Sequence, residues 1–302
     1  MAHRRALLVI NRRSRQGESD LSRPLALLAE HGVLVDVEPV EDPSSIPAVI
    51  EARAQDIDIV IVAGGDGTVN AAVDQLVRHG LPLGVLPLGT ANDLARTLCI
   101  PANLEEASEV IAAGRRHEID LGWVNGKHFL NVASIGLSVS VAEELTADVK
   151  RRWGPLSYLI SAARVLRNTP PFRARIQCDK RILRMWATQV AVGNGRYYGG
   201  GMTVAEEARI DDGTLHLYAI KPRRLLDYVA LLPALRRGRH KHSQGVHVAQ
   251  GTEIEVITRP RLPINTDGEV TTKTPGHFRV VPRALAVFVP AAYGRRQAGA
   301  SC

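Results

Sequence analysis

Residues 57–68 read IDIVIVAGGDGT, and this stretch decides how the first part of the chain folds. Ile57–Ala63 is apolar enough to form a buried central strand, and it runs directly into a glycine-rich turn followed by a helix-forming segment. Glycines let the backbone turn tightly and approach a ligand, and the free N–H groups at a helix N-terminus favour an anion. The stretch therefore predicts a phosphate-binding turn, although a strand-to-helix turn that is rich in glycine for structural reasons alone would look the same.

The acid in this turn makes the prediction more specific. Asp66 is flanked by Gly64, Gly65 and Gly67. An aspartate beside a bound phosphate would repel it unless a divalent cation lay between them. Asp66 therefore favours metal-assisted phosphoryl transfer over simple anion binding.

The first third of the chain alternates short apolar runs with amphipathic stretches. This is a βαβ pattern, which predicts a parallel sheet. The expected strands are Ala6–Asn11, Val33–Glu38, Ile57–Ala63 and Leu83–Leu86, and the expected helices include Leu21–His31 and Val69–His79.

After Leu121 the pattern changes to short strands joined by tight turns. Asn125-Gly126 and Asp179-Lys180 each separate a pair of strand-like runs, as expected for β-hairpins. Helical interruptions are expected at 139–147, 155–167 and 224–235. The sequence thus predicts an α/β nucleotide-binding domain with a Rossmann-like parallel sheet over residues 1–122. A larger β-rich domain, an antiparallel sandwich, is predicted over residues 123–302, with the extreme C-terminus able to return to the first domain.

A second polar turn, Pro87–Asp93, follows the strand at Leu83–Leu86. Both polar turns are expected at the carboxyl edge of the same sheet, where open α/β sheets bind their ligands. Thr90 and Asn92 can hydrogen-bond a nucleotide or the helix backbone, and Asp93 offers a second carboxylate to a metal. Alternatively, Asn92-Asp93 merely caps the helix that follows.

A third polar cluster, Asn265–Glu269, lies far downstream. Asp-Gly is most often a plain turn. A kinase also needs a carboxylate near the acceptor hydroxyl to take its proton, and Glu269 would suit that role.

Together these motifs resemble the diacylglycerol kinase family of bacterial lipid kinases, which shares its catalytic domain with sphingosine and ceramide kinases. The resemblance spans nearly the whole chain in the family's order. It rests on GGDGT at 64–68, PLGTAND at 87–93, GNGRYYGGGM at 193–202, DDGTL at 211–215 and DGE at 267–269. It implies an ATP-dependent lipid kinase that binds nucleotide between two domains and holds its lipid substrate in the β-rich domain.

The resemblance also implies a role for individual residues. Asp66 and Asp93 would belong to a catalytic Mg²⁺ network, and Glu269 would be the general base. A separate structural Mg²⁺ would be held by the Asp212 side chain and the backbone carbonyls of Arg209 and Thr214. The nucleotide would be bound by Asn11, Gly64, Gly65, Gly67, Thr68, Val69, Asn70 and Thr90.

One loop departs from the family pattern. The family's first loop reads Asn-Pro-x-Ser-Gly-x-Gly, whereas residues 11–17 read NRRSRQG and lack a proline and a glycine. Arg12, Arg13 and Arg15 can neutralise phosphate charge. An altered affinity for ATP is therefore as plausible as a loss of activity.

Charge and hydropathy indicate the partners. The net charge of +7 suits an anionic partner, and no apolar run is long enough for an export signal or a membrane span. We expect a cytoplasmic protein with peripheral contact at the membrane surface, made by the basic segment Lys221–His242 or by Lys150–Trp153. Nucleic acid is not an expected partner, because the basic residues are scattered and few aromatics accompany them. The oligomeric state cannot be read from the sequence.

Two alternatives stay open at this stage. A soluble-metabolite kinase of the NAD kinase or phosphofructokinase type would also use a glycine-flanked aspartate, although Tyr197–Met202 and Asp267–Glu269 favour the lipid branch. A nucleotide-binding regulator that has lost catalysis would explain the altered loop at Asn11–Gly17.

Overall fold

The computed structural model describes residues 3–14, 19–137, 170–195, 197–198, 202–203, 208–222 and 245–294. The chain divides into two compact units. The first comprises Met1–Leu121, Gly199–Gly201 and Val281–Cys302, and the second comprises Gly122–Tyr198 and Met202–Val280. The helices predicted at 139–147, 155–167 and 224–235 lie outside the described residues.

The first unit contains a parallel sheet in the order β2-β1-β3-β4-β18. Neighbouring strands run parallel throughout. Strand β3 is buried along its whole length, as expected for a strand covered on both faces. The strands are β1 (Arg4–Asn11), β2 (Val33–Val40), β3 (Ile59–Gly64), β4 (Leu83–Pro87) and the C-terminal part of β18 (Gly276–Phe288). The predicted parallel α/β architecture is confirmed.

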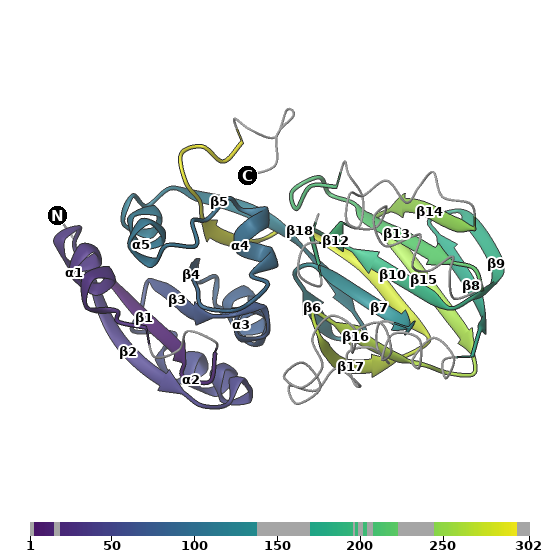
Figure 1. Ribbon diagram of the computed structural model, residues 1–302, viewed down its shortest axis with the longest axis horizontal. Coiled ribbons are helices and arrows are strands. Elements are labelled where there is room, and N and C mark those ends of the chain that lie inside the picture. Colours follow the sequence, from purple (N-terminus) through teal and green to yellow (C-terminus); the bar gives the residue numbers. More distant parts are fainter. Residues whose placement is uncertain are drawn as a thin grey trace, which may run out of the picture. The chain divides into compact units, whose positions relative to one another are not determined.

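Helices cover both faces of this sheet (Figure 1). Helices α1 (Ser22–Glu30) and α5 (Leu104–Ala112) pack together, and α2 (Ile46–Arg53) packs with α3 (Asp66–His79). Two short elements, the 3₁₀ turn η1 (Pro43–Ser45) and helix α4 (Asp93–Thr97), also belong to this unit. None of the helices in the described part of the chain is long and apolar enough to cross a bilayer.

Helix α3 begins three residues earlier than predicted, at Asp66 instead of Val69. Gly65 precedes the helix in an extended conformation, with φ −95° and ψ −175°, so the chain enters the helical conformation directly after it. Asp66, Gly67 and Thr68 therefore form the first helical turn instead of a loop. The weak helix propensity of Gly67 hid this start in the sequence.

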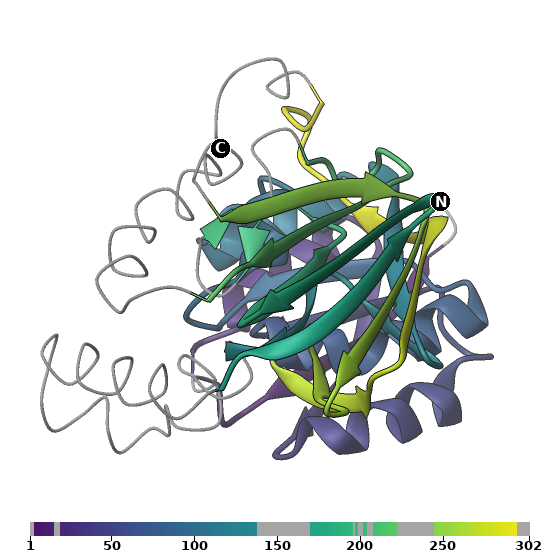
Figure 2. The same cartoon turned by 90° about the vertical axis from the view of Figure 1, so that its right-hand side faces the viewer.

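The second unit contains two antiparallel sheets. One has the order β14-β13-β10-β7-β16-β17, and Figure 2 shows its strands side by side. Its strands are β7 (Val132–Gly136), β10 (Gln189–Gly193), β13 (Leu215–Ile220), β14 (Val246–Gly251), β16 (Pro263–Thr266) and β17 (Glu269–Lys273). In the other sheet, the N-terminal part of β18 pairs with β15 (Glu253–Arg259), which pairs with β8 (Phe172–Cys178), and β8 pairs with β9 (Arg181–Ala187). Three shorter strands, β6 (Lys127–Phe129), β11 (Tyr197–Tyr198) and β12 (Met202–Thr203), and strand β5 (Arg116–Val124) complete the fold.

The inward side chains of these two sheets form one hydrophobic core. Ile135 and Leu217 come from the first sheet, and Phe172, Ile254 and Phe278 come from the second. This arrangement is a sandwich, and it confirms the predicted β-rich architecture. The predicted hairpins are present as well. Asn125 and Gly126 both have positive φ, 48° and 101°, between β5 and β6, as a primed two-residue turn requires.

One glycine of the hairpin between β5 and β6 provides a test of the packing. Gly122 lies opposite Phe129, and a Cβ at Gly122 would lie 2.1 Å from the Phe129 ring. Phe129 is fully buried and cannot move aside without disturbing the core. We expect Gly122→Ala to lower the free energy of unfolding by about 1–3 kcal/mol in denaturant titrations. Gly195→Ala is the control, because a Cβ there meets no atom nearer than 3.5 Å. An equal loss in both variants would contradict this account.

Candidate active site

Three loops meet at the carboxyl edge of the parallel sheet. Strands β1, β3 and β4 end in register there, with Ile10 beside Ala63 and Gly64 beside Pro87. The side chain of Asn11, at the end of β1, donates to Oγ1 of Thr68 in the first turn of α3, at 3.0 Å. Both side chains are buried. The loop that follows β1 is therefore linked to the first turn of α3.

The two glycine-rich turns approach each other so closely that side chains would not fit between them. A Cβ at Gly89 would lie 2.5 Å from the Cα of Gly65, and a Cβ at Gly65 would lie 3.2 Å from the Cα of Gly89. The backbone N–H of Leu88 donates to the carbonyl of Gly64 at 2.9 Å. The sequence indicated two glycine turns, but only the tertiary structure shows that they are in contact.

Asn92 shapes the second turn. It adopts the left-handed conformation with φ 48°, where Asn is more tolerated than most residues. Its Oδ1 accepts from the N–H of Gly89 at 3.0 Å, and its Nδ2 donates to the Gly89 carbonyl at 3.1 Å. The side chain of Asn92 therefore closes the loop and does not cap α4, contrary to the capping alternative. Thr90, inside this loop, is exposed.

Asp66 and Asp93 form a carboxylate pair at the junction of the two turns. Oδ1 of Asp66 accepts from the backbone N–H of Leu94 at 3.2 Å, so Asp66 supplies the first turn of α4 with an acceptor. Asp93 is buried. Burial raises the pKa of Asp66 above its ordinary value, and the negative charge of Asp93 raises it further. The structure thus brings together the two acids that the sequence assigned to a metal network.

This pair has the chemistry of a Mg²⁺ site. Among the described residues there is no group of three or more side chains of the metal-binding type. Mg²⁺, however, is commonly bound by one or two carboxylates together with waters and substrate phosphates. A half-buried and a buried carboxylate that repel each other gain stability from a divalent cation. Asp66 and Asp93 therefore fit the ion that the sequence implies.

The first turn of α3 adds donors at the same edge. The N-terminal N–H groups of a helix and its dipole attract anions, and nothing lies within 4 Å of where a Cβ of Gly67 would be. Oδ1 of Asn70 is buried and accepts no hydrogen bond from the described residues. Buried polar atoms are normally satisfied, so Asn70 is a candidate contact for a donor group of a ligand or a water.

Val69 has a structural role here. Its side chain is buried in the core, and its N–H donates to the Gly65 carbonyl at 3.1 Å. Both groups are used within the fold. Val69 therefore offers a nucleotide neither a free backbone N–H nor an exposed side chain.

In the second unit, Asp267 holds the chain at the start of β7. Its Oδ2 accepts from the N–H of Leu130 at 2.6 Å, and its Oδ1 accepts from Asn131 at 2.9 Å and Val132 at 3.0 Å. Three charge-assisted bonds to consecutive N–H groups order this turn. In the sequence, Asp267 is recognisable only as part of a motif. The structure shows that its carboxylate acts as a clamp, because it accepts hydrogen bonds from three consecutive backbone N–H groups.

The predicted base, Glu269, is exposed at the first position of β17. It follows the turn formed by Asp267 and Gly268, where the N–H of Gly268 donates to Oδ1 of Asn265 at 2.9 Å. Glu269 belongs to the second unit, whereas Asp66 and Asp93 belong to the first. A common site for the three acids stays a prediction.

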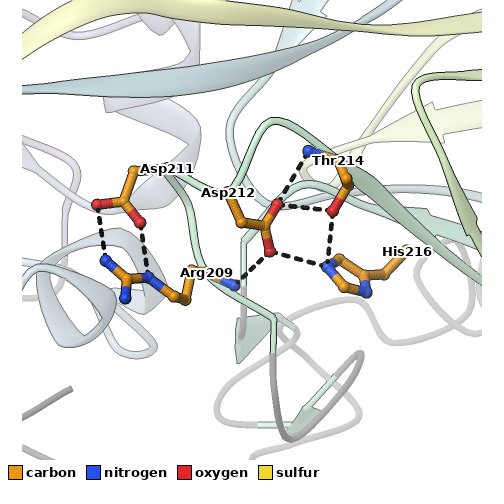
Figure 3. A network of polar contacts seen from close by, with 5 residues as sticks. All are labelled: Arg209, Asp211, Asp212, Thr214 and His216. Atoms are coloured by element: carbon orange, nitrogen blue, oxygen red, sulfur yellow. Dashed lines mark hydrogen bonds and ion pairs between the residues drawn. The ribbon is translucent and has the colours of Figure 1, made fainter. Parts of the chain in front are cut away.

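The predicted structural Mg²⁺ loop is closed by its own donors (Figure 3). Oδ2 of Asp212 accepts from the N–H of Arg209 at 3.0 Å, and Oδ1 accepts from the N–H of Thr214 at 2.9 Å and its Oγ1 at 2.7 Å. Nε2 of His216 lies 3.1 Å from Oδ2. Burial by itself would raise the pKa of Asp212, but the bonds from His216, Thr214 and Arg209 outweigh it and hold the pKa below its ordinary value.

These contacts bear on the metal prediction. An ionised carboxylate offers about four acceptor sites, and the four donors around Asp212 occupy them. A cation bound through this carboxylate would have to replace a donor, and His216 is the neighbour that the sequence reading overlooked. The residues as arranged do not fit such an ion, and the ligand set of Arg209, Asp212 and Thr214 stays a prediction.

Several predicted segments fall partly or wholly outside the described residues. In the first loop, Arg13 pairs with Glu41 at 3.2 Å, and residues 15–17 are not described. Of the basic segment Lys221–His242, only residues 221 and 222 are described, and Lys150–Trp153 lies outside.

Comparison with known proteins places the chain in a family. Residues 5–124 match the model of the diacylglycerol kinase catalytic domain, and residues 131–289 match the model of the YegS C-terminal NAD kinase beta sandwich-like domain. The chain belongs to the bacterial diacylglycerol kinase family of lipid kinases. The predicted resemblance is thereby confirmed.

Individual relatives agree with this family. A Klebsiella pneumoniae (strain 342) protein named "Probable lipid kinase YegS-like" is 31% identical over 94% of this chain and 96% of its own length. A Bacillus subtilis (strain 168) protein named diacylglycerol kinase is 29% identical over 80% of each chain. The crystal structure of a candidate diacylglycerol kinase of Bacillus anthracis str. Sterne is 25% identical, covers 97% of both chains and has a TM-score of 0.82.

The carboxylate pair predicts an unusual response to Asp66→Asn. A carboxyl whose pKa is higher in the folded than in the unfolded state stabilises the fold while protonated, and this contribution is lost as the pH rises through the folded pKa. At neutral pH in EDTA, we expect Asp66→Asn to melt at a higher temperature than the wild type. The difference should shrink below about pH 4, the ordinary range of an aspartate.

Mg²⁺ should reduce the difference in melting temperature between Asp66→Asn and the wild type. A cation that binds only the folded state raises the melting temperature of the wild type. The measurement is thermal unfolding with EDTA or with Mg²⁺, and the exposed Asp56→Asn in the same unit is the control. A lower melting temperature for Asp66→Asn than for wild type in EDTA would contradict the account of the pair.

The clamp at Asp267 makes a second prediction. In Asp267→Asn, one carboxylate oxygen becomes an NH₂ group that faces a backbone donor. We expect a loss of about 1–3 kcal/mol in the free energy of unfolding, measured in denaturant. Asp179→Asn is the matched control, because Asp179 has a similar φ of 48° but accepts from Thr252 and Glu253 at the longer distances of 3.3 and 3.2 Å. Equal losses in the two variants would argue against the clamp.

Proposed function

We propose that this chain transfers the γ-phosphoryl group of ATP to a hydroxyl group of a lipid, with diacylglycerol as the first acceptor to test. Its family is one of lipid kinases, and its relatives include proteins named diacylglycerol kinase. The observation that carries the proposal is the carboxylate pair at the first turn of α3, formed by the half-buried Asp66 and the buried Asp93. That arrangement suits phosphate and a divalent cation together.

The nucleotide phosphates would lie against the first turn of α3. The extended Gly65 and the open space at Gly67 allow a phosphate to approach the backbone N–H groups, and the helix dipole favours its charge. Asn11 and Thr68 hold each other in place at one side of this turn. The exposed Thr90 and the buried amide of Asn70 are further contacts that we assign to the nucleotide.

Asp66 and Asp93 would hold Mg²⁺, which when bound neutralises charge on the transferring phosphoryl group. The backbone of Leu94 keeps Asp66 in position through its hydrogen bond. Contact between the two turns at Gly65 and Gly89 keeps the carboxylates on neighbouring loops together. The chain thus supplies a preorganised pair of ligands and little covalent chemistry of its own.

Glu269 is our candidate for the general base. As the new bond forms between the lipid oxygen and the γ-phosphorus, the bond to the bridging oxygen of ADP breaks, and the hydroxyl proton passes to the Glu269 carboxylate. An exposed carboxylate is available for this exchange. The Asp267 clamp fixes the turn from which Glu269 projects.

We also propose that the protein acts in the cytoplasm at the inner membrane surface, because its substrate would reside in the bilayer. The related proteins named above are described as lipid or diacylglycerol kinases, which supports a lipid acceptor. Neither a soluble-metabolite kinase nor an inactive regulator is favoured by these relatives.

The proposal is tested by phosphate transfer from labelled ATP to diacylglycerol in mixed micelles. We expect the wild type to transfer phosphate, and we expect Asp66→Asn and Glu269→Gln each to lower kcat by about 100-fold or more. Removal of Mg²⁺ with EDTA should abolish transfer, and Mg²⁺ should restore it.

Two surface variants serve as controls. Asp56→Asn and Glu253→Gln change exposed acids in the first and second units and should keep full activity. Undiminished transfer by both Asp66→Asn and Glu269→Gln would refute the roles assigned to them. Faster phosphorylation of NAD or a sugar phosphate than of any lipid in a panel would refute the acceptor class.

A further inference from the structure

The outward face of strands β15, β8 and β9 differs from a usual solvent-facing sheet. Side chains alternate along these strands, and those that point inward, such as Phe172, Ala174 and Ile176, belong to the core of the sandwich. Outward side chains line up in rows across the three strands. One row is Arg259, Arg173 and Trp186, the next is Ile257, Arg175 and Arg184, and the third is Glu255, Gln177 and Ile182. We call these residues the arginine–tryptophan face.

Two large apolar side chains are exposed on this face. Trp186 and Ile182 are each 52% exposed, and both come from β9. The Arg173 guanidinium stacks on the Trp186 ring, with its central carbon 5.1 Å from the ring centroid. An arginine over tryptophan covers one face of the ring but leaves the residue half exposed. Large apolar side chains exposed on the same sheet face as arginines make that face a candidate interaction surface.

The charge on this face is predominantly positive. Arg173, Arg184 and Arg259 are exposed, and none of them forms an ion pair with any residue in the described part of the chain. Arg175 is neutralised, because it pairs with Glu255 at 2.7 Å. Three arginines of this face therefore have no ion-pair partner among the described residues, and one of them, Arg173, stacks on the exposed tryptophan.

We propose that the arginine–tryptophan face is a docking surface for an anionic lipid bilayer. Tryptophan favours the boundary between headgroups and acyl chains, because its ring is apolar and its N–H is polar. Arginines near an anionic bilayer are attracted by the surface potential. The face offers both properties together on an open sheet surface, which suits a planar membrane.

Other occupants match this face less well. Two copies of the chain that met through it would bring like charges together, which opposes self-association. A single-stranded nucleic acid would need several aromatic platforms for successive bases, and Trp186 is the sole aromatic in the three rows. Charge complementarity combined with the exposed Trp186 and Ile182 on the edge strand β9 thus favours an anionic lipid surface.

This inference rests on the proposed function, since a lipid kinase must reach its substrate in a bilayer. Binding to vesicles does not require catalysis, however, so the docking surface and the kinase activity can be refuted independently of each other. The basic segments predicted from the sequence, Lys150–Trp153 and Lys221–His242, are different candidates, and the arginine–tryptophan face was not among them.

The test is co-sedimentation of the full chain with vesicles of phosphatidylcholine mixed with phosphatidylglycerol, compared with vesicles of phosphatidylcholine alone. We expect the wild type to prefer the anionic vesicles and to lose that preference at about 1 M salt, where charges are screened over about 3 Å. The double variant Arg173→Gln/Arg184→Gln should bind the anionic vesicles about tenfold to thirtyfold more weakly. Trp186→Ala should weaken binding with less dependence on salt.

The control double variant is Arg23→Gln/Arg116→Gln. Both arginines are exposed, and Arg116 stacks on Phe288 at 5.5 Å much as Arg173 stacks on Trp186, so both double variants lose two positive charges and one stacked arginine. Unlike Arg184, Arg23 pairs with an acid, Glu30, at 3.5 Å. This variant should bind vesicles more tightly than the face variant by about tenfold. Equal weakening in the two double variants would overturn the proposal and point to net charge alone.

Four further results distinguish this proposal from its alternatives. Equal wild-type binding to both kinds of vesicle would overturn it, as would dimerisation that Trp186→Ala abolishes. Phosphate transfer in detergent micelles by Arg173→Gln/Arg184→Gln at the wild-type rate, with weak vesicle binding, would support it. An inactive wild type that still binds anionic vesicles through these arginines would refute the proposed function and leave the docking surface intact.

Discussion

The contact between Gly65 and Gly89 is the constraint on which the candidate site depends. A side chain at Gly89 would collide with the backbone of the facing turn, so the close approach requires glycine. Because the turns touch, Asp66 at the start of α3 reaches the backbone N–H of Leu94 in α4. The same contact places the charges of Asp66 and Asp93 near each other, which raises the pKa of Asp66. Separating the turns would remove both the hydrogen bond and the repulsion.

The carboxylates of this protein have two different uses. Asp267 and Asp212 accept several hydrogen bonds from their own surroundings and so order a turn and a loop. Asp66 instead keeps a raised pKa, because burial and a neighbouring charge outweigh its backbone donors. A carboxylate whose oxygens accept hydrogen bonds from N–H groups stabilises the local structure. A carboxylate that lies close to a second negative charge favours binding of a cation. The motifs GGDGT and DDGTL look alike in sequence, yet their aspartates differ in this respect.

The sequence predicted much of the fold, because buried parallel strands and amphipathic helices leave strong local patterns. The strand predicted at Leu83–Leu86 is observed at Leu83–Pro87, and the helix predicted at Leu21–His31 is observed at Ser22–Glu30. The start of α3 was placed three residues late, because Gly67 resembles a loop residue when its neighbours in space are unknown. The alternative in which the side chain of Asn92 caps α4 was wrong, because in its left-handed conformation that side chain bonds to Gly89.

The sequence by itself determined the fold class, the order of the motifs and the family, since these depend on residue types and spacing along the chain. Only the tertiary structure decided that the turns at Gly65 and Gly89 touch, that Asp267 binds three consecutive N–H groups, and that His216 neighbours Asp212. It alone showed that Arg173, Arg184, Arg259 and Trp186 share one exposed face. These relations join residues on different strands and loops, and the register between strands, which sets them, is not encoded in any single local stretch.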